Sequence, residues 1–581
     1  MKITGAELFV KALKAEGVST LFAYPGGQAI DLFDALYGEK DIDVILPRHE
    51  QGLIHAADGY ARVTGKPGVC LVTSGPGATN LVTGIATANY DSVPLVCFTG
   101  QVATGLLGKK AFQEVDIVDI TKSICKEAVT VRNREELGET IRKAFATAVT
   151  GKPGVVVVDL PKDIQQALGS DCYEPYEKAE ICEQAHYIVE KLEPVWELLN
   201  AARRPLLLAG GGVCIARAQQ ELQQFVKCLG IPVVTTIMGR GAVSTTQDLY
   251  VGNIGIHGSY AANMAVSKCD VLLAVGTRFN DRITGRIDTF ASGAKIIHID
   301  IDETCLERNI RTDLSFQMDA GEALGALLQK AEPLETGSWL AQIGQWKREH
   351  PLAMSGKGLS PQEIIEAINE CFTDAVIATD VGQNQLWTTQ YLALDDHKQM
   401  LTSGGLGTMG YGFPAAIGAK LGQPEKDVLV ISGDGGMQMN IQELATAVVY
   451  ELPVIVCILN NGYLGNVRQW QEMFYDRRYA GTCMRFRRSC ERYGNNFGCA
   501  CVSGDNGEDV CPPYTPDFIQ LAQSYGAQGI RVARKEQIQE AFAWAKQNKK
   551  TPTIIEFIVE REGNVLPIVR PGDSLDKMTL I

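Results

Sequence analysis

Short, continuous apolar runs alternate along this chain with stretches in which apolar residues recur at helical spacing. A run that is apolar at every position is typical of a strand buried on both faces, and its alternation with helices predicts a parallel sheet covered on both sides. The pattern divides the chain into three such regions and a tail, at residues 1–165, 186–332, 358–560 and 561–581. We therefore expect an α/β protein with three doubly wound parallel-sheet domains.

The individual runs place the expected strands. They are DVILP, GVCLV, VPLVCFTG and GVVVVDLP in the first region, and PLLLAGGGV, PVVTT, DVLLAVGTRF and KIIHIDID in the second. Residues 165–185 are polar and residues 331–358 are punctuated by Pro and Gly, so we interpret both segments as linkers. After the second linker, Ser360 is a suitable N-cap with Pro361 at the first helical position, which predicts the start of a helix.

Residues 427–463 carry a more specific pattern. It predicts a strand over residues 428–432, a glycine turn that holds Asp434, an amphipathic helix of about four turns, a strand over residues 454–459 and an Asn-Asn-Gly turn. Because a right-handed crossover brings both turns to the carboxyl ends of parallel strands, Asp434 and Asn461 should face one crevice. Carboxylate, amide and carbonyl oxygens suit Mg²⁺, and glycines allow a backbone to approach a diphosphate.

A Gly-Asp-Gly turn by itself is most often ordinary turn chemistry. Here it is paired with Asn-Asn after 24 residues (436–459), with a strand, a helix and a strand in place, and this pairing resembles the thiamine-diphosphate motif. In that motif the acid and the second Asn are metal ligands. The residue two positions beyond, here Tyr463, lends its backbone carbonyl.

Two further turns in the first region carry candidate chemistry. Glu50 follows an expected strand and opens an expected helix, where the positive end of the helix dipole favours an acid for structural reasons alone. Residues 74–80, SGPGATN, form a second strand-glycine-helix turn that can pass close to a ligand. Both turns therefore admit a structural as well as a functional interpretation.

The composition excludes several classes of function. With 54 basic and 68 acidic residues the formal net charge is −14, and no basic stripe offers a surface to nucleic acid or an anionic membrane. No apolar run approaches the roughly 18 residues of a membrane span, and the N-terminal residues fit an amphipathic helix better than a signal peptide. Eleven of the 16 cysteines are scattered singly, as is usual for small buried residues. We expect a cytoplasmic protein with reduced thiols.

Motifs spread over nearly the whole chain extend these signals to a family resemblance. They are HEQ (49–51), TSGPGATN (73–80), AFQE (111–114), DLPKD (159–163), GGLGTMGYG (404–412), GDGGMQMNIQELAT (433–446), RQWQ (468–471) and NVLPIVRPGDSLDKM (564–578). In this order and spacing, the sequence resembles the catalytic large subunits of acetohydroxyacid synthase, also called acetolactate synthase. The resemblance implies an N-terminal pyrimidine-binding domain, a central FAD-binding domain and a C-terminal diphosphate-binding domain.

The resemblance also implies a reaction. Enzymes of this family decarboxylate pyruvate on thiamine diphosphate and join the hydroxyethyl unit to a second 2-keto acid, either pyruvate or 2-ketobutyrate. This is the first common step of valine, leucine and isoleucine biosynthesis. The family binds Mg²⁺ with the diphosphate and FAD without a redox role in the main reaction. It forms homodimers or homotetramers and often binds a separate small regulatory subunit.

Catalytic roles follow residue by residue from the matching motifs. Glu50 matches the acid that interacts with N1′ of the thiamine pyrimidine, and in the family it serves the active site of the partner subunit. Arg282 matches the arginine that selects the acceptor, and a planar guanidinium suits a carboxylate. Trp470 matches the tryptophan that favours the longer acceptor side chain. Gln113 and Lys162 match positions that orient substrate or cofactor, and Phe112 matches a further active-site position.

The matching motifs imply three sets of binding residues. The metal ligands are Asp434, Asn461 and the Tyr463 carbonyl. The expected contacts of thiamine diphosphate are Gly27, Glu50, Val381, Gly382, Gln383, Met409, Gly435, Gly436 and Tyr463. The expected contacts of FAD are Lys152, Gly211, His257, Arg278, Asp300 and Asp319.

The sequence departs from the family pattern in several places. Lys152 replaces a common Arg at the FAD site, and the other replacements are Ala103, Ile256, Asn384 and Asn466. The largest departure is an insertion at about residues 482–513. It contains Cys483, Cys490, Cys499, Cys501 and Cys511, without the two CxxC pairs of a zinc site. A metal site, disulfides and an uncommitted loop all stay open for this insertion.

Three other functions compete with the biosynthetic synthase. A catabolic acetolactate synthase would lack FAD, whereas this chain has the central FAD-type motifs and the tryptophan of RQWQ. A flavin-dependent pyruvate oxidase would reduce its flavin when pyruvate is added. A scaffold subunit without activity would have lost Glu50, Asp434 or Asn461, and all three residues are present.

Overall fold

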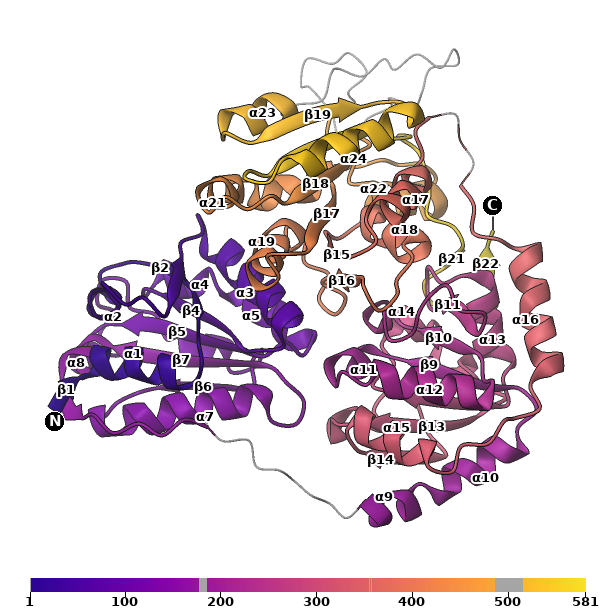
Figure 1. Cartoon of the computed structure of the whole chain (residues 1–581), viewed down its shortest axis with the longest axis horizontal. Coiled ribbons are helices and arrows are strands. Elements are labelled where there is room, and N and C mark those ends of the chain that lie inside the picture. The colour runs from indigo at the N-terminus through magenta and orange to yellow at the C-terminus, as the bar shows by residue number, and fades with distance from the viewer. Residues whose placement is uncertain (1, 177–184, 355, 357, 486–515, 581) are drawn as a thin grey trace.

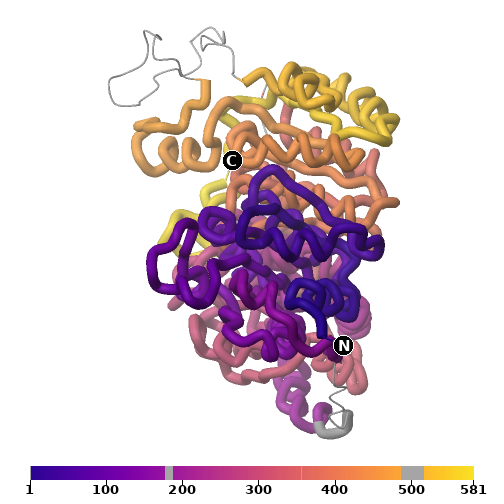
Figure 2. The backbone as a smooth tube through the Cα atoms, turned by 90° about the vertical axis from the view of Figure 1, so that its left-hand side faces the viewer, coloured from indigo at the N-terminus to yellow at the C-terminus, as the bar shows by residue number. Residues whose placement is uncertain are grey.

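The computed structural model describes residues 2–176, 185–354, 356, 358–485 and 516–580. Within this part of the chain, three parallel sheets have six strands each, and two small antiparallel pairs join β1 to β8 and β21 to β22. Figure 1 shows the three sheets with their flanking helices as separate bodies, and Figure 2 shows the C-terminal body at the opposite end from the central one. The expected α/β class with three parallel-sheet domains is confirmed.

The N-terminal sheet has the strand order β3-β2-β4-β5-β7-β6. Its strands are β2 (Thr20–Tyr24), β3 (Asp43–Ile45), β4 (Gly68–Val72), β5 (Leu95–Gln101), β6 (Glu127–Thr130) and β7 (Val155–Pro161). Its helices are α1 (Gly5–Ala15), α2 (Ile30–Leu36), α3 (Glu50–Thr64), α4 (Pro76–Thr79), α5 (Val82–Tyr90), α6 (Ile117–Thr121), α7 (Leu137–Val149) and α8 (Lys162–Gln166). The apolar runs predicted four of these strands. They missed β2 and the edge strand β6. The residues of β6 are only half-buried.

The central sheet has the strand order β11-β10-β9-β12-β13-β14. Its strands are β9 (Pro205–Ala209), β10 (Val233–Thr235), β11 (Tyr250–Asn253), β12 (Val271–Val275), β13 (Lys295–Asp300) and β14 (Leu314–Gln317). Its helices are α9 (Ala185–Lys191), α10 (Glu193–Ala201), α11 (Gly211–Ile215), α12 (Gln219–Leu229), α13 (Tyr260–Lys268), α14 (Asp281–Thr284) and α15 (Ala320–Leu328). Numbered within the sheet, this is the order 3-2-1-4-5-6 of dinucleotide-binding folds.

The C-terminal sheet has the strand order β16-β15-β17-β18-β20-β19, which repeats the order of the N-terminal sheet. Its strands are β15 (Ala375–Thr379), β16 (Gln399–Leu401), β17 (Asp427–Gly433), β18 (Ile455–Asn460), β19 (Gln528–Val532) and β20 (Thr553–Ile558). Its helices are α17 (Pro361–Cys371), α18 (Gln383–Tyr391), α19 (Gly412–Gly422), α20 (Asp434–Met437), α21 (Glu443–Val449), α22 (Gly465–Phe474), α23 (Phe518–Ser524) and α24 (Ile538–Gln547). Ser360 caps α17 as predicted, through a capping box with Glu363.

The first segment interpreted as a linker is partly a strand. β8 (Leu168–Ser170) pairs antiparallel with β1 (Lys2–Thr4) and so ties this segment to the start of the chain. Arg134 stabilises the pair, because its guanidinium donates to backbone carbonyls of both strands. The rest of the predicted linker includes residues 177–184, which lie outside the described residues.

The interpretation of residues 331–358 as a linker is wrong for their central part. These residues contain the helix α16 (Gly337–Glu349), which buries Trp339 and Ile343. The Trp339 indole donates to the carbonyl of Pro205 over 3.1 Å. Trp339, Ile343 and Trp346 lie on one helical face, and this periodicity outweighs the Pro and Gly residues that flank the helix.

The amphipathic helix predicted after Asp434 is also wrong in its continuity. The chain forms α20, then a 3₁₀ turn over Gln438–Asn440, and only then α21. The physical reason is a tertiary contact, since Asn440 Nδ2 donates to the carbonyl of Gly410 over 2.8 Å. The Asn side chain therefore holds the turn against a neighbouring loop, and the apolar periodicity on its own could not reveal this.

The N-terminal and C-terminal domains pack tightly through α3 and α19, which lie side by side in Figure 1. A Cβ added at Gly59 would lie 2.0 Å from the Ala415 carbonyl oxygen, and one at Gly418 would lie 1.7 Å from the Ala56 oxygen. Glycines therefore allow the two backbones to touch. In the same interface Tyr411 donates to the Asp58 carboxylate over 2.7 Å.

The C-terminal tail runs back to the central domain. Val569, in β21 (Ile568–Val569), is fully buried and donates its backbone N–H to the Ile256 carbonyl over 2.8 Å. The chain then ends with β22 (Met578–Thr579), which pairs with β21. Among the described residues, no helix has the length and apolar character needed to cross a membrane.

Candidate functional site

The strand orders place ligand sites at defined points of each sheet. In open α/β sheets, ligands bind at the carboxyl ends of the two strands between which the strand order reverses. In the N-terminal sheet these strands are β2 and β4, followed by the turns at residues 25–27 and 73–77. In the C-terminal sheet they are β15 and β17, followed by residues 380–382 and by Asp434. The sequence-predicted cofactor residues of both domains therefore lie at these reversal points or beside them.

Glu50 begins α3 and is buried, with 9% of its surface exposed. Its Oε2 accepts a hydrogen bond of 2.9 Å from Asn80 Nδ2, at the end of the SGPGATN turn. A Cβ added at Gly77 would lie 3.5 Å from Glu50 Oε1, so the glycine turn passes directly beside the carboxyl group. The structure thus brings together the two N-terminal turns that the sequence singled out separately.

The other predicted residues of the N-terminal domain surround the same turns. Lys162 Nζ donates to the Gly27 carbonyl over 2.8 Å and forms an ion pair of 3.3 Å with Asp31. Gln113 adopts a left-handed backbone conformation with φ of 59°. It packs against the glycine turn, because a Cβ added at Gly75 would lie 2.9 Å from Gln113 Cβ and from its carbonyl oxygen. Phe112 is 86% exposed. Its apolar ring therefore faces outward from this chain.

Asp434 is the only carboxylate of the predicted metal clamp, and it is 1% exposed. Burial raises the pKa of Asp434 to about 7, against the opposing effect of backbone N–H groups that include those of Gly435 and Gly462. Its Oδ2 has no hydrogen-bond partner among the described residues. A buried carboxylate oxygen without a partner is costly unless a cation neutralises it.

The second half of the clamp is the turn after β18. Asn461 is buried, and its Oδ1 accepts from the Tyr463 backbone N–H over 3.0 Å. The preceding Asn460 accepts from the Gly462 N–H over 3.1 Å and donates to Glu556 over 2.7 Å, which fixes the turn from behind. One carboxylate with amide and carbonyl oxygens fits Mg²⁺, a hard cation that keeps several of its own ligands.

The described residues contain no group of three or more His, Cys, Asp or Glu side chains that could hold a metal by themselves. A cation at the clamp would therefore need oxygens from a ligand or water, as a diphosphate supplies. Of the insertion, Cys490, Cys499, Cys501 and Cys511 lie outside the described residues. Cys483 forms an isolated backbone bridge with Tyr463, so the start of the insertion contacts the clamp.

Asp380 is a residue of this site that sequence reasoning missed. It is buried at the end of β15, and burial raises the pKa of its carboxyl group. Its oxygens accept from the backbone N–H groups of Gly410 and Gly412 at 3.0 and 3.1 Å, on either side of the turn that carries Met409. The position of Asp380 directly before the predicted cofactor turn was the only signal available in the sequence.

The N-terminal domain of the same chain also forms hydrogen bonds to the segment that carries Met409. Asp91 accepts from the backbone N–H groups of Gly404 and Gly405 at 3.2 and 2.7 Å, and Thr87 and Thr408 share a hydrogen bond of 2.7 Å between their hydroxyls. A Cβ added at Gly435 would lie 3.7 Å from the terminal methyl of Met409, so the turn reaches the clamp. Met409 is thus positioned by contacts from two domains.

Glu443, another missed residue, connects the two predicted turns within one chain. It lies in α21 and accepts from the backbone N–H groups of Arg48 and His49, immediately before Glu50. Burial raises the pKa of this carboxyl group. Glu50 itself keeps its hydrogen bond to Asn80 in its own domain.

Arg282 and Trp470, predicted separately, meet at the boundary between the central and C-terminal domains. The Arg282 guanidinium carbon lies 5.8 Å from the centre of the Trp470 ring, in cation–π contact. The Arg282 side chain is 61% exposed, with one loose ion pair of 3.8 Å to Asp281. The guanidinium therefore has hydrogen-bonding capacity left for an anion. The Trp470 indole N–H is buried without a hydrogen-bond partner among the described residues.

The central sheet reverses its order between β9 and β12, and a cleft of about 2520 Å³ opens beside these strands. Gly210 and Gly212, after β9, lie so close to Gly276, after β12, that a Cβ on either would clash with its backbone. Burial raises the pKa of Asp300 in this cleft to about 6. Five of the six residues predicted to contact FAD line the cleft, namely Lys152, Gly211, Arg278, Asp300 and Asp319.

Two of these predictions acquire a more specific meaning. His257 does not line the cleft, and burial lowers the pKa of its imidazole to about 4, with the Arg282 charge adding to the effect. Asp319 caps α15 by accepting from the backbone N–H groups of Gly321 and Glu322, so helix capping alone explains an acid there. A cleft of this size at a reversal point, between glycine turns, fits a dinucleotide such as FAD.

Comparisons with known proteins agree with this architecture. Three family models match the chain: the N-terminal TPP binding domain of thiamine pyrophosphate enzymes at residues 3–120, their central domain at residues 192–327, and their C-terminal TPP binding domain at residues 380–557. Each match overlaps one of the three parallel sheets. The turns around Glu50 and Asp434 lie in the two domains named for binding of the cofactor.

Full-length relatives are more specific. The chain is 42% identical to the acetolactate synthase large subunit of Parasynechococcus marenigrum (strain WH8102), with 99% of this chain and 91% of the relative aligned. It is 41% identical to the acetolactate synthase large subunit of Corynebacterium glutamicum, over 99% and 89% of the two chains. It is 39% identical to the acetolactate synthase isozyme 2 large subunit of Escherichia coli (strain K12), over 99% of both.

Proposed function

Since this chain belongs to the family of acetolactate synthase large subunits, we propose that its thiamine-diphosphate site is built from the turns around Glu50 and Asp434. Family membership gives the reaction, which is acetolactate synthesis in the branched-chain amino-acid pathway. The observation that carries the site assignment is Asp434, a fully buried carboxylate with an unpartnered oxygen at the reversal point of the C-terminal sheet.

Mg²⁺ and the diphosphate would be held by the C-terminal domain. Asp434 supplies the carboxylate, Asn461 the amide oxygen and Tyr463 the backbone carbonyl. The backbone of Gly435 and Gly436 would face the diphosphate, and the turn at residues 381–383 would border it. Thiamine diphosphate, when bound, supplies an electron sink that lets pyruvate lose CO₂. The protein's contribution is orientation, exclusion of water and control of protons.

Glu50 would hold a proton at the pyrimidine end of the cofactor. Its carboxyl group is buried and kept in place by Asn80, and glycine turns leave a cradle beside it. In this chain Glu50 is bonded within its own domain, while Glu443 links its helix to the clamp segment. We propose a homodimer or homotetramer in which each Glu50 serves the clamp of the neighbouring subunit.

Arg282 and Trp470 would form the acceptor site. The half-exposed guanidinium can pair with the carboxylate of the second 2-keto acid, and the stacked indole gives its side chain an apolar wall. Pyruvate and 2-ketobutyrate are the proposed acceptors. Gln113 and Lys162, which anchor the turns beside Glu50, would orient substrate and cofactor.

FAD is the proposed occupant of the central cleft, without a redox role in the main reaction. The strand order, the glycine contacts between β9 and β12, and the five predicted residues that line the cleft support it. The relatives are named large subunits, which supports a separate small regulatory subunit as a partner.

A product assay tests the proposed function. Purified protein with thiamine diphosphate, Mg²⁺ and FAD should convert pyruvate to 2-acetolactate, and pyruvate with 2-ketobutyrate to 2-aceto-2-hydroxybutyrate. Sustained bleaching of the flavin by pyruvate, with no acetolactate formed, would instead indicate a pyruvate oxidase.

A Glu50→Gln variant tests the central assignment within that assay. Gln keeps the size of the side chain and its hydrogen bond to Asn80, but it cannot exchange the proton. We expect unchanged binding of thiamine diphosphate and a loss of turnover of about 100-fold or more, the usual range for a lost acid or base. Turnover within a factor of two of the unmodified protein would refute the role of Glu50.

A further inference from the structure

Gln469 lies on α22 directly before Trp470, and its side chain is completely buried. We propose that Gln469 is a positioning residue that fixes which atom of the Asn461 amide faces the bound cation. The inference rests on the proposed role of Asn461 as a metal ligand. It assigns a purpose to a residue of the RQWQ motif to which neither the family resemblance nor the described site gave a role.

An amide ligand has an orientation problem that a carboxylate does not have. The oxygen and the NH₂ group of Asn have nearly the same shape, but only the oxygen can bind a cation. Rotation of the amide by half a turn therefore costs little sterically and abolishes ligation. The surrounding hydrogen bonds must select the correct orientation.

The selection begins at the backbone of the C-terminal tail. Gln469 Nε2 donates to the Val565 carbonyl, and Gln469 Oε1 accepts from the Val565 N–H, both over 2.9 Å. A backbone N–H cannot accept and a carbonyl cannot donate, so a reversed Gln469 amide would lose both bonds. The tail thus fixes the orientation of Gln469.

Gln469 then fixes Gln383, the residue that opens α18. Gln383 Nε2 donates to Gln469 Oε1 and to the Gly563 carbonyl, both over 2.9 Å. Because both partners can only accept, the NH₂ group of Gln383 must point toward the tail. Its oxygen must therefore point toward the clamp.

Asn461 is the last amide in the series. Its Nδ2 donates to Gln383 Oε1 over 3.2 Å, so its Oδ1 is turned away from Gln383. That oxygen accepts from the Tyr463 N–H over 3.0 Å and keeps a second lone pair for the cation. The backbone of Val565 thus fixes the orientation of Gln469, Gln469 fixes that of Gln383, and Gln383 fixes that of the proposed metal ligand Asn461.

Burial makes the series effective. Gln469, Gln383 and Asn461 are 0%, 3% and 5% exposed, so little water is available to replace a lost bond. Inside a protein, a polar group left unpaired is costly, and hydrogen bonds in a network strengthen one another. A misoriented amide would therefore be strongly disfavoured while Gln469 is present.

The test replaces Gln469 by Met, which keeps the length of the side chain and removes its hydrogen bonds. Isothermal titration with Mg²⁺ in the presence of thiamine diphosphate gives the metal affinity without a measurement of activity. We expect Gln469→Met to weaken Mg²⁺ binding by about 10- to 100-fold, as is typical for residues that orient a metal ligand. Unchanged affinity would overturn the proposal.

A second background separates orientation from packing. In Asn461→Asp both ends of the side chain are oxygens, so no orientation needs to be selected. We expect Gln469→Met to cause little further loss of Mg²⁺ affinity in that background. An equal loss in both backgrounds would mean that Gln469 acts only through packing, and the proposal would fail.

Two controls complete the design. Gln423→Met removes a side-chain bond of 3.0 Å from Gln423 to the Val63 carbonyl, which is not part of the amide series, and should leave Mg²⁺ affinity unchanged. Asn461→Ala tests the premise, because loss of the ligand itself should weaken binding. If Asn461→Ala binds Mg²⁺ normally, the metal role proposed for Asn461 fails. If only Gln469→Met is without effect, the orientation proposal alone fails.

Discussion

In the proposed acceptor site, the side chain of Trp470 would set the choice of acceptor. Its ring contacts the Arg282 guanidinium at 5.8 Å and the Phe474 ring at 6.0 Å, so the indole offers apolar surface beside the charge. One methylene group in an apolar pocket is worth a discrimination of about 10-fold or somewhat more. We expect Trp470→Leu to reduce the preference for 2-ketobutyrate over pyruvate by up to about 10-fold.

Competition between the two acceptors, with quantitation of both products, measures this preference. The rate with pyruvate alone should change much less than the product ratio. Arg282→Lys is the companion variant, since Lys keeps the charge but lacks the planar fork that pairs with a carboxylate. It should lower kcat/KM for both acceptors together. A product ratio unaltered by Trp470→Leu would remove Trp470 from the specificity site.

The buried imidazole of His55 makes the folding stability of the protein depend on pH. Its imidazole is fully buried with no hydrogen-bond partner for either nitrogen among the described residues, and burial lowers its pKa from 6.5 to about 4. The folded protein therefore binds fewer protons than the unfolded chain between these pH values. By linkage, stability is lost as the pH falls from about 6.5 to about 4.

His55 accounts for a loss of about 3 kcal/mol in the free energy of unfolding as the pH falls from about 6.5 to about 4. His55→Phe, which keeps an aromatic ring against Tyr411, should remove that part of the acid sensitivity. Denaturant unfolding of the cofactor-free protein at several pH values measures it. His397, which is exposed, provides the matched control, and His397→Phe should leave the pH dependence unaltered. Identical pH profiles for His55→Phe and the unmodified protein would contradict the prediction.

The crossing of α3 and α19 is the element contact on which both halves of the site depend. The helix α3 starts at Glu50, and α19 follows the turn that carries Met409. At the crossing, a Cβ on Gly418 would lie 1.7 Å from the Ala56 oxygen, which is a backbone atom that cannot rotate away. We expect Gly418→Ala to separate the helices and to cost about 1–3 kcal/mol of unfolding free energy.

Gly325 in α15 is the matched control for this substitution. It also lies within a helix, but a Cβ there would meet no atom within 4 Å. Gly325→Ala should be neutral or stabilising by up to about 1 kcal/mol, because Ala has the higher helix propensity. Chemical denaturation of both variants checks the comparison. A Gly418→Ala protein as stable as Gly325→Ala would show that the two helices can shift apart freely.

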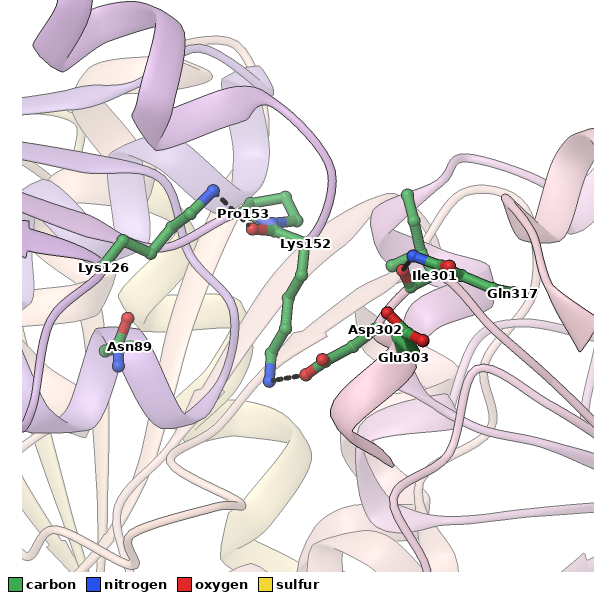
Figure 3. A pocket seen from close by; sticks show the side chains of 8 residues that line it. All are labelled: Asn89, Lys126, Lys152, Pro153, Ile301, Asp302, Glu303 and Gln317. Carbon is green, nitrogen blue, oxygen red and sulfur yellow. Dashed lines mark hydrogen bonds and ion pairs between the residues drawn. The ribbon is translucent and has the colours of Figure 1, made fainter. Parts of the chain in front are cut away.

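The whole molecule is joined at a third boundary, between the N-terminal and central domains. Lys152 reaches across this boundary and forms an ion pair of 2.7 Å with Asp302, beside a cavity of about 370 Å³ (Figure 3). Burial favours the neutral acid, but hydrogen bonds from Lys152, Thr304 and Cys305, together with the Lys152 charge, outweigh it and hold the pKa of Asp302 well below its usual range. Lys152 also lines the central cleft, so one side chain belongs to both the domain contact and the proposed flavin site.

We expect Lys152→Met to weaken flavin binding by about two- to fivefold, the effect of losing a partly exposed ion pair. Flavin absorbance per chain after dialysis measures it, and Mg²⁺ affinity should not change. Lys122→Met removes an exposed pair with Asp119 and should retain flavin normally. Equal retention by both variants would separate Lys152 from the flavin site.

The fold was largely predictable because buried parallel strands leave continuous apolar runs, as in β4, β12 and β17. The failures have tertiary causes. α16 was hidden by the Pro and Gly around it although Trp339 and Ile343 are buried, and the helix after Asp434 is interrupted by a contact of Asn440 with another loop. Strand order was not predictable, since it depends on which strands meet in space.

The candidate site divides in the same way. Asp434, Asn461 and Glu50 lie in turns next to predicted strands and helices, so the sequence pattern was enough to identify them. Asp380, Asp91, Glu443 and Gln469 act on partners that are distant in sequence, so no local pattern shows which groups they hold. Lys152 and Asp300 come from different domains, so only the assembled structure could show that they line the same cleft.

The sequence by itself determined the three α/β regions, the family and the reactive groups, because periodicity and turn chemistry are local properties of the chain. Only the tertiary structure decided the strand orders, the cleft between the domains and the contacts that hold Met409 and Asn461 in place. Those features depend on long-range packing and on hydrogen bonds between segments up to several hundred residues apart, such as the bond from Tyr411 to Asp58. Local sequence patterns therefore identified the reactive groups, whereas the fold determined how those groups are oriented.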